Sequence, residues 1–439
     1  MRVRQGTGAR QGSFRLIGFL GAAAQYAHLL RSQYWSPDRL RRYTEGHLAR
    51  ALEAAGRIPF YRERFGATPV RPADLPRLPI VSRREIPLLV DSVRSLDPSV
   101  RRYVDSSRTS GSTGMPVSFL YDAPHQATRF AARARYLRAH GWTPLSRNCW
   151  IISTSIQSPD AVFSRRARWF GARFLSHLVS LEEQAHWLRE LDPAFLYAYP
   201  VNLDGLSRMF EAERWRLPSL RRIFSGSEVL EPSLRERLRR VFGVEVADNY
   251  GSTEAFLAWQ CPAGSYHMNA EHVLLEIVDD AGQPVGAGEM GRVLVTTLHN
   301  RVMPLIRYAI GDYAFAAGES CECGRTLPLI GAIAGRELNL FVDGQGKRIV
   351  PWALFRPLTA RGWVKQYQIV QRPGRLVVRF VADREMGPDD EAEIRQHFAT
   401  VLRSAAAVEL DRVAHIPRAP SGKFMLAMNE GVLASGIDR

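Results

Sequence analysis

The spacing of hydrophobic positions changes along the chain and separates an α/β region from an antiparallel one. Short apolar runs at Asn148–Ser153 and Phe195–Tyr199 are typical of buried strands. Helical periodicity lies around and between these runs, at about 123–139, 181–190 and 231–242. Because strands alternate with helices here, we expect an α/β core with parallel strand pairing.

The pattern after residue 265 is that of paired strands joined by glycine-rich turns. The segments His272–Asp279 and Arg292–Leu298 flank the turn Asp280-Ala281-Gly282. Two strand-like segments around a turn of this kind predict antiparallel β-structure.

A second change comes near Gly335 and predicts a separate C-terminal unit. Beyond it, Val364–Val370 and Leu376–Val381 flank the turn Pro373-Gly374, and a helix is expected over 389–403. These elements make a compact α+β unit of about one hundred residues, a size typical of a small domain. We therefore expect a domain boundary at 334–336.

The N-terminal region carries clear helix signals after a less regular start. Ser36-Pro37 places a capping hydroxyl before a proline at the first helical position. That helix should end near Gly56, and Ser82 is a second expected cap. Residues 1–35 combine a basic start with an apolar run that falls short of the roughly 18 residues a membrane span needs. We expect a terminal extension ending in a helix, without stable membrane insertion.

Composition excludes several classes of protein. The 439 residues suffice for two or three core-forming units, and 46% hydrophobic with 23% charged residues is typical of a soluble globular protein. The net charge of +15 has three explanations: nucleic-acid binding, attraction of anionic small molecules, or a genome that favours arginine. The arginines are scattered and no basic run interleaves with aromatic residues, so we expect no nucleic-acid partner. Four cysteines make no disulfide scaffold, which favours a reducing, cytoplasmic location.

The first candidate for chemistry is a loop rich in hydroxyl groups and glycine. It consists of Thr109, Ser110, Gly111, Ser112, Thr113 and Gly114. Backbone N–H groups and short hydroxyl donors on such a loop can surround a polyphosphate. Met115 follows where the P-loop of NTPases has lysine, so this is not a P-loop. A solvated surface loop is the alternative for this run taken alone.

Four further motifs follow along the chain. Asn249-Tyr250-Gly251-Ser252-Thr253-Glu254 follows a strand-like segment, and its tyrosine offers a flat face to a purine while its glutamate can hold a divalent cation. A carboxylate such as Asp312 can accept hydrogen bonds from both hydroxyls of a ribose. The remaining two motifs are Gly335-Arg336 and Ser421-Gly422-Lys423. Each has a structural alternative, a turn or a surface lysine, when taken alone.

The order of these motifs carries more information than any one of them. Thr-Ser-Gly-Ser-Thr-Gly, Tyr-Gly-Ser-Thr-Glu, Tyr-x-x-Gly-Asp, Gly-Arg and a C-terminal Gly-Lys together resemble the adenylate-forming superfamily of acyl-CoA synthetases and adenylation domains. Within it the chain resembles the phenylacetate–CoA ligase-like branch, which includes capsule-biosynthesis homologues. Supporting residues are Ile58-Pro59-Phe60-Tyr61-Arg62, Leu78-Pro79-Ile80, Tyr199-Pro200 and Gly226-Ser227-Glu228. The resemblance covers roughly residues 36–430.

The resemblance implies an α/β fold in two main parts. A large domain over 36–334 would bind ATP and the acid, with mixed and parallel β-sheets flanked by helices and a small β-barrel-like part. A small, mobile α+β domain over 335–439 would act as a lid, and residues 1–35 would be an extension. The oligomeric state is left open, with a homodimer among the alternatives.

The resemblance also implies a role for each motif. The loop Thr109–Gly114 would hold the β- and γ-phosphates of ATP, and Lys423 would bridge the attacking carboxylate and the α-phosphate. Thr253 and Glu254 would serve the α-phosphate and Mg²⁺. The nucleoside would be bound by Gly226, Ser227, Glu228, Asn249, Tyr250, Gly251, Ser252, Asp312 and Arg336.

Two positions depart from the pattern of the superfamily. Met115 stands where many relatives carry a basic residue beside the phosphate loop. Leu338 stands two residues after Arg336, where relatives have a polar hinge residue. Met115 puts one contact to the γ-phosphate in doubt. Leu338 puts in doubt how freely the C-terminal domain rotates. These departures favour a degenerate nucleotide-binding homologue as an alternative, whereas Lys423 argues against it.

A separate set of residues has the composition of a metal site. Cys261, His267, Cys321 and Cys323 offer three sulfurs and one imidazole, which suits tetrahedral zinc. Similar pairs occur in some phenylacetate–CoA ligase-like proteins. The alternative is buried free cysteines beside an unrelated histidine. Cys149, inside an apolar run, is expected to be a core residue.

The function expected from these observations is that of an AMP-forming acid–thiol ligase. A carboxylic acid would react with ATP to give an acyl-adenylate and pyrophosphate, and the acyl group would pass to coenzyme A. Trp142, Tyr197–Pro200 and Phe224 are expected to wall the acid pocket, which favours an aromatic acid. An amine acceptor, giving an amide in polysaccharide or natural-product assembly, is the alternative to coenzyme A.

Overall fold

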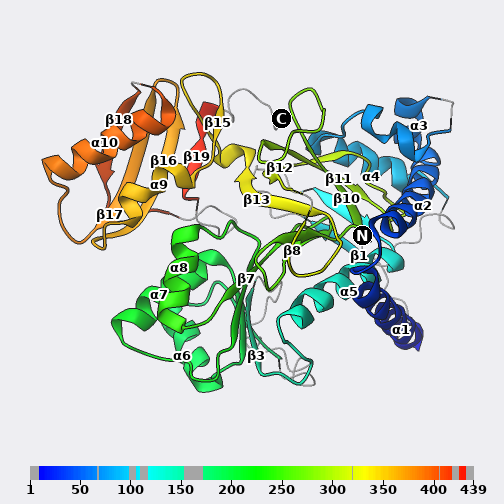
Figure 1. Cartoon of the computed structure of the whole chain (residues 1–439), viewed down its shortest axis with the longest axis horizontal. Helices are drawn as coiled ribbons and strands as arrows, with labels where there is room; N and C mark the ends of the chain where they lie inside the picture. The colour runs from blue at the N-terminus through cyan, green and yellow to red at the C-terminus, as the bar shows by residue number, and fades with distance from the viewer. Residues whose placement is uncertain are drawn as a thin grey trace, which may run out of the picture.

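The computed structural model describes residues 9–66, 69–97, 105–108, 117–152, 172–318, 320–404, 406–417 and 425–431. In this part of the chain a large mixed sheet forms the centre, and a small sheet with its own helices lies at the C-terminal end (Figure 1). The N-terminal helices cover the far end of the large sheet (Figure 1).

The large sheet has eleven strands in the order β10-β11-β12-β13-β9-β8-β7-β6-β5-β3-β4. Its parallel half is made of β3 (Asn148–Ile152), β4 (Ala172–Ser176), β5 (Phe195–Ala198), β6 (Arg222–Gly226) and β7 (Val246–Gly251). Its antiparallel half is made of β8 (Phe256–Gln260), β9 (Tyr266–Met268), β10 (Val273–Val278), β11 (Met290–Thr297), β12 (Tyr308–Ala316) and β13 (Leu329–Arg336). The antiparallel strands, expected as a barrel-like part, thus continue the parallel strands in one sheet.

Helices lie on both sides of this sheet and at its ends. The N-terminal ones are α1 (Ala9–Ser32), α2 (Pro37–Gly56), α3 (Pro59–Phe65), α4 (Ile86–Arg94) and α5 (Ala123–Ala139), with short 3₁₀ turns η1 (Pro72–Arg77) and η2 (Arg83–Glu85). Those of the parallel half are α6 (Leu181–Leu191), α7 (Pro200–Ala212) and α8 (Pro232–Phe242). A hairpin of β1 (Asp105–Arg108) and β2 (Ser118–Tyr121) precedes α5.

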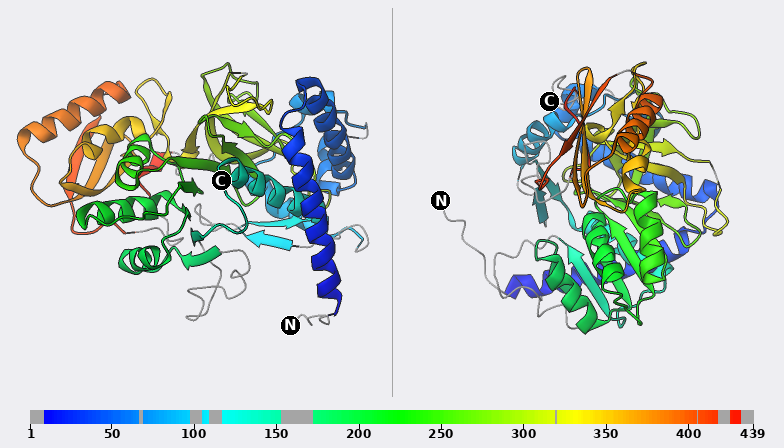
Figure 2. Two further views of the ribbon diagram at one scale, coloured as in Figure 1. Left: turned by 60° about the horizontal axis from the view of Figure 1, so that its bottom comes forward. Right: turned by 90° about the vertical axis from the view of Figure 1, so that its left-hand side faces the viewer.

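The parallel strands are apolar on both faces because helices cover both. Ile151 and Leu196 face one core, which contains α6, α7 and α8. Their neighbours Phe195 and Tyr197 face a second core, which contains α5 and the end of α1. Successive side chains of a strand point to opposite faces, so a strand buried on both sides must be apolar throughout. Figures 1 and 2 show α1 beside α5 in this second layer.

The antiparallel half shares a third core with α2, α3 and α4. Tyr61 and Leu89 pack there against Val293 and Ile306, all of them fully buried. The Tyr61 hydroxyl donates to the carbonyl of Pro304 at 2.8 Å. The early helices are therefore tied to the middle of the chain by burial and by hydrogen bonds.

The C-terminal part is a four-stranded sheet in the order β18-β17-β16-β19, joined to the large sheet through β13. Its elements are β16 (Val364–Arg372), β17 (Arg375–Ala382), β18 (Ala407–Arg412), β19 (Ala427–Asn429), α9 (Trp352–Thr359) and α10 (Pro388–Leu402). Before them come η5 (Glu337–Asn339), β14 (Phe341–Val342) and β15 (Arg348–Ile349). Its contacts with the large part include Arg348, which donates to Asp280 at 3.0 Å, and Tyr367, which bonds to Glu231.

Most elements expected from the pattern are present. The helix after Ser36 runs to Gly56, and the Ser36 hydroxyl accepts from the Arg39 N–H at 3.4 Å. The expected helices at 123–139, 181–190 and 231–242 correspond to α5, α6 and α8. These observations confirm the mixed α/β fold class. Cys149 is buried in the core, as expected.

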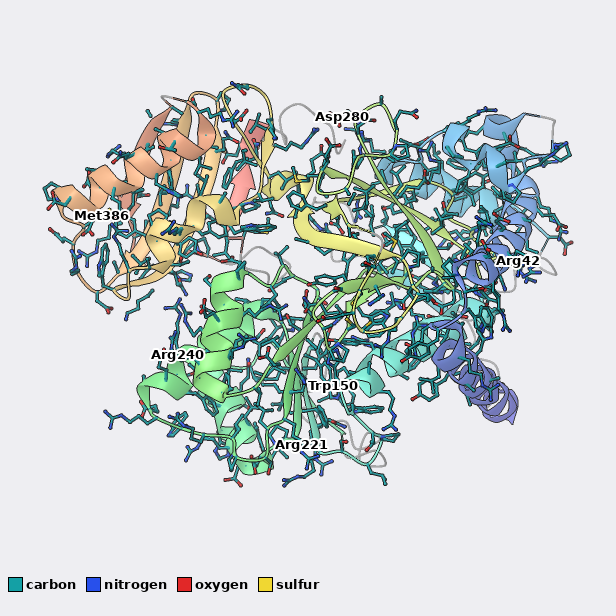
Figure 3. The ribbon with its side chains drawn as sticks, viewed as in Figure 1. Arg42, Trp150, Arg221, Arg240, Asp280 and Met386 are labelled. Atoms are coloured by element: carbon teal, nitrogen blue, oxygen red, sulfur yellow. The ribbon has the colours of Figure 1, made fainter. Side chains whose placement is uncertain are left out.

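Basic side chains are spread over distant parts of the surface. Arg42 lies at the N-terminal end, and Arg221 and Arg240 at the outer side of the parallel half (Figure 3). Arg240 pairs with Glu211 at 3.0 Å. Among the described residues, no helix combines the length and the apolar composition needed to cross a membrane.

Candidate active site

A cavity of about 1640 Å³ lies where the parallel strands end, between α7, α8, the β12–β13 pair and the C-terminal sheet. Residues just past β5, β6 and β7 line it, among them Tyr199, Ser227 and Ser252. Ligands of α/β proteins bind at the carboxyl ends of parallel strands, where loops from several strands meet. The cavity is therefore the candidate active site.

Tyr250, Asp312 and Arg336 form one connected group in the cavity wall. The Tyr250 hydroxyl donates to the Asp312 Oδ2 at 2.8 Å, and the Arg336 Nε lies 3.7 Å from the Oδ1. The pairing of β12 with β13 places Asp312 opposite Arg336. Burial first, and then the Asp312 carboxylate, raise the pKa of Tyr250 well above its usual value, so the phenol keeps its proton. This group holds an aromatic ring, a carboxylate and a guanidinium in fixed relation.

The turn Ser252–Glu254 follows β7 and carries a buried carboxyl group into the cavity wall. Glu254 is 3% exposed. Burial raises the pKa of Glu254, and the nearby cations Arg83 and Arg336 act against the rise. A divalent cation bound beside a buried carboxyl group would favour the ionised form of that group.

The segment Gly226–Glu228 follows β6 on the neighbouring strand. A Cβ at Gly226 would lie 2.6 Å from the Asn249 Nδ2 and 2.7 Å from the Tyr197 hydroxyl, so only glycine fits. Ser227 has φ of 70°, which is rare for a residue with a side chain. Glu228 accepts from the Val201 N–H at 3.3 Å at the start of α7. Strained backbone of this kind concentrates at binding sites.

The structure brings the predicted residues of the central motifs together. Lining the cavity are Ser227, Glu228, Asn249, Tyr250, Gly251, Ser252, Thr253, Glu254, Asp312 and Arg336. The backbone of Gly226 adjoins this group at Asn249. Seven predicted residues lie outside the described part of the chain: Thr109, Ser110, Gly111, Ser112, Thr113, Gly114 and Lys423. The strands that flank the first six, β1 and β2, pair with each other, with Arg108 opposite Ser118.

Two residues expected in the acid pocket lie elsewhere. Phe224 is fully buried in the core between α5 and the sheet, where its ring lies 5.3 Å from that of Tyr136. Trp142 packs beside the same core. Neither lines the cavity, whereas Tyr197, Tyr199 and Pro200 do. The expectation for Phe224 and Trp142 is wrong. For Phe224 the reason is that an aromatic residue of a strand shows no preferred face until the register of the strand is known.

Sequence reasoning missed the arginines of the cavity wall other than Arg336, and two of them act on the Ser252–Glu254 turn. The charge of Arg83, in η2, acts to lower the pKa of the Glu254 carboxyl. Arg129, in α5, donates to carbonyl groups of the Ser252–Glu254 turn. Neither belongs to a motif, and no local pattern distinguishes them from the other arginines of a chain with 59 basic residues.

The four residues of the predicted metal site lie together. Each of Cys261, His267, Cys321 and Cys323 offers one ligand atom, and these atoms all lie within 4.8 Å of one another. The sulfurs of Cys261 and Cys321 lie 3.6 Å apart, and the Cys323 sulfur lies 3.2 Å from the His267 Nε2.

The donor set suits zinc, and the separations are close to those of a zinc site: the sulfur–sulfur distance of 3.6 Å lies within the expected range, and the sulfur–nitrogen distance of 3.2 Å is slightly shorter. Tetrahedral zinc, with Zn–S of about 2.3 Å and Zn–N of about 2.0 Å, separates its ligand atoms by about 3.5–3.8 Å. His267 presents Nε2 to the sulfurs, and its Nδ1 bonds the Leu327 carbonyl at 3.1 Å. That second contact fixes the ring in the way usual for metal-binding histidines.

Comparison with known proteins agrees with the motifs. The family model "AMP-binding enzyme" matches residues 172–303. A phenylacetate–coenzyme A ligase of Thermus thermophilus is 28% identical over 381 residues, covering 82% of this chain and 81% of the relative. These matches confirm the resemblance to the adenylate-forming superfamily and to its phenylacetate–CoA ligase-like branch.

Solved structures share the fold. A 2-hydroxyisobutyryl-CoA ligase in its postadenylation state aligns with a TM-score of 0.73 and 20% identity, over 92% of this chain and 94% of that one. The amide bond synthetase McbA from Marinactinospora thermotolerans aligns with a TM-score of 0.53 and 19% identity, over 72% and 66% of the two chains. Both likenesses concern the architecture.

Proposed function

We propose that this chain is an AMP-forming acid–thiol ligase that uses ATP to activate a carboxylic acid and then transfers the acyl group to coenzyme A. In the first step a carboxylate oxygen attacks the α-phosphorus, and the bond to the β-phosphate breaks to release pyrophosphate. In the second step the thiol sulfur attacks the acyl carbon and loses its proton, and AMP leaves with the oxygen that came from the acid.

The observation that carries the proposal is the group of Tyr250, Asp312 and Arg336 in one cavity. A purine can stack on the Tyr250 ring while the ribose hydroxyls donate to the Asp312 carboxylate beside it. Arg336, on the neighbouring strand, then lies where the ribose–phosphate region would pass. A nucleotide has its base, ribose and phosphate in this order.

The remaining roles follow from the motifs. Thr109–Gly114 would hold the β- and γ-phosphates, and Thr253 and Glu254 the α-phosphate and Mg²⁺. Lys423 would stabilise the charge that develops when the carboxylate meets the phosphate. Attack of one anion on another needs such cations, and losing one comparable interaction costs about 10²–10³ in rate.

We propose zinc as a structural ion at Cys261, His267, Cys321 and Cys323, because donor set and spacing fit it. Thiolate ligands must stay reduced, which favours the cytoplasm as location. The domain limits proposed are 1–35, 36–334 and 335–439, with the last part acting as a lid.

An aromatic acid is the substrate that we favour. Tyr197 lines the cavity, and its ring stacks on that of Trp150 with centroids 4.9 Å apart. Flat rings of this kind accept a flat aryl group. An amine in place of coenzyme A is the second candidate, since an amide bond synthetase shares the fold.

The test is acid-dependent exchange of pyrophosphate into ATP with a panel of aryl, arylacetic, hydroxy, fatty and amino acids. Mass spectrometry with coenzyme A, and separately with amines, then identifies the product. Lys423→Ala should abolish exchange and spare ATP binding, and Lys347→Ala, an exposed lysine of the same C-terminal part, should change neither. Pyrophosphate exchange without formation of any thioester would favour amide formation over transfer to coenzyme A. The absence of exchange with every acid would refute the ligase proposal.

A further inference from the structure

Three side chains converge on the backbone of the Ser252–Glu254 turn. The Tyr121 hydroxyl donates to the Thr253 carbonyl at 2.5 Å. The Arg129 guanidinium donates to the carbonyls of Thr253 and Ser252, each at 3.2 Å. The His125 Nε2 lies 2.9 Å from the Glu254 carbonyl. Three successive carbonyl groups are thus each held by a side chain more than one hundred residues away.

The three donors share one short stretch of chain. Tyr121 ends β2, Asp122 caps α5 by accepting from the His125 N–H at 3.0 Å, and His125 and Arg129 lie four residues apart on one face of that helix. The Tyr121 and His125 rings stack in parallel, with centroids 5.2 Å apart and planes at 4°. The donors therefore form one rigid unit, which we name the carbonyl clamp.

Burial fixes the chemistry of two of the donors. Tyr121 is 1% exposed and His125 is fully buried. Burial, followed by the charge of Arg129, lowers the pKa of His125 to about 3, so the ring is neutral at ordinary pH. Since a carbonyl can only accept, the proton of the neutral ring must be on Nε2. The clamp thus presents three fixed donors.

The turn is closed from within by contacts between Ser252 and Ala255. Ser252–Glu254 belongs to neither a helix nor a strand. The Ser252 N–H donates to the Ala255 carbonyl at 2.9 Å, and the Ser252 hydroxyl contacts the carbonyl and the N–H of Ala255 at 3.3 and 3.2 Å. Carbonyl groups outside regular structure need partners when they are buried. The partners here come from the clamp, and the turn carries Thr253 and Glu254 on the cavity side.

We propose that Tyr121, His125 and Arg129 are positioning residues for adenylation. By fixing the carbonyl side of the turn they aim Thr253 and Glu254 at the α-phosphate and its divalent cation. This inference rests on the function proposed above. A misplacement of about 1 Å in such groups costs on the order of 10² in rate, so the clamp matters although two of its members never meet substrate.

The location of the three residues separates this role from direct binding. Arg129 lines the cavity, whereas Tyr121 and His125 do not. If Arg129 acted only on substrate, a substitution of Tyr121 would not reproduce the effect of removing Arg129. If all three act through the turn, their loss should produce one shared change in the use of the divalent cation.

The experiment measures pyrophosphate exchange against Mg²⁺ concentration in Tyr121→Phe, His125→Gln, Arg129→Met and Arg129→Lys. We expect kcat to fall about 10-fold in Tyr121→Phe and about 100-fold in Arg129→Met, and both to need several-fold more Mg²⁺ for half-maximal rate. The KM for the acid should stay unchanged. Arg129→Lys, which keeps the charge and one donor direction, should recover part of the rate.

Arg138→Met is the matched control, because it makes the same substitution at an exposed site of α5. It should behave as the wild type. If Arg129→Met does not fold, Tyr121→Phe and Arg129→Lys carry the test, since they keep the ring or the charge. A Mg²⁺ dependence unchanged in both Tyr121→Phe and Arg129→Lys, or a change confined to Arg129 variants, would overturn the clamp while leaving the ligase proposal standing. A wild type without exchange would overturn both.

Discussion

Among the described residues, the most buried ion pair links α5 to the turn before β10, and its hydrogen bonds reach the end of α1. Arg135 and Glu271 are 1% and 0% exposed at their side chains, with an Arg135 Nη1 to Glu271 Oε1 distance of 2.7 Å. Arg135 also donates to the Asn269 Oδ1 at 2.7 Å and to the Leu29 carbonyl at 3.2 Å, and the Ser32 hydroxyl donates to Glu271 at 2.6 Å. We predict that Glu271→Gln strongly destabilises the large part of the fold.

The size of the effect follows from burial. The substitution leaves the Arg135 charge in place without its counter-ion and turns amide hydrogens toward its N–H groups. Removing one partner of a buried pair costs about 3–5 kcal/mol, far more than at the surface. The packing should change little, because glutamine has nearly the shape of glutamate.

The matched control is Glu276→Gln. Its partner Arg307 is also buried, but that guanidinium donates as well to the carbonyls of Pro76, Leu78 and Gly282 at 2.7–2.9 Å. Three neutral acceptors remain for this charge, against two for Arg135, and the Glu276 side chain is 13% exposed whereas that of Glu271 is fully buried, so the cost should be smaller.

The assay is urea unfolding followed by tryptophan fluorescence, with Trp259 as a natural reporter 5.7 Å from the Arg135 guanidinium. Burial alone would raise the pKa of Glu271, but Arg135 overrides it and the net pKa is lowered. A lowered folded-state pKa gives stability that is present above about pH 4.5 and is lost as pH falls further. In Glu271→Gln this part of the decrease in stability below about pH 4.5 should be absent. An unfolding free energy within about 1 kcal/mol of the wild type at neutral pH would refute the reasoning.

Three further predictions test other parts of the structure. Cys321→Ser should reduce the zinc content, measured by elemental analysis, from about one equivalent to a small fraction, and should lower the melting temperature. Unchanged zinc content and melting temperature would contradict the proposed zinc site. Burial first, and then Asp204, raise the pKa of Glu231 to about 7, so stability should fall as pH rises from about 4.5 to 7; a Glu231→Gln variant whose urea midpoint keeps that fall would count against it. Asp312→Asn should raise the KM for ATP roughly 10- to 100-fold, because a hydrogen bond to a charged group contributes about 1.5–3 kcal/mol. An unchanged KM would rule out ribose binding there.

Local signals predicted most of the described helices but not α3, α7 or α9, and packing explains the case of α7. Ser36 supplies a cap for α2, and hydrophobic periodicity marks α5, so both could be located from the sequence. The helix α7 was not expected, because it contains Gly205 in its interior. A Cβ there would lie 2.5 Å from the Leu181 Cδ1, so glycine permits close packing of α6 on α7. That requirement is tertiary and leaves no local mark.

The same distinction holds for the site. Tyr250 and Asp312 lie in ordered motifs, and their convergence could be expected from the resemblance. The clamp could not, because its contacts join residues more than 120 positions apart and involve ordinary residue types. The metal site could be predicted in part. The residue types indicated a metal, but the pairing of Leu329 with His267, which brings Cys321 and Cys323 near His267, could not be predicted.

The central claim is that an acid oxygen becomes bonded to the α-phosphorus of ATP in this cavity. The most direct measurement is a reaction with acid labelled with ¹⁸O in its carboxylate, followed by mass spectrometry of the nucleotide product. The account predicts AMP that carries one ¹⁸O atom, formed together with pyrophosphate and dependent on the acid. Unlabelled AMP, or ADP with phosphate as the product, would contradict it.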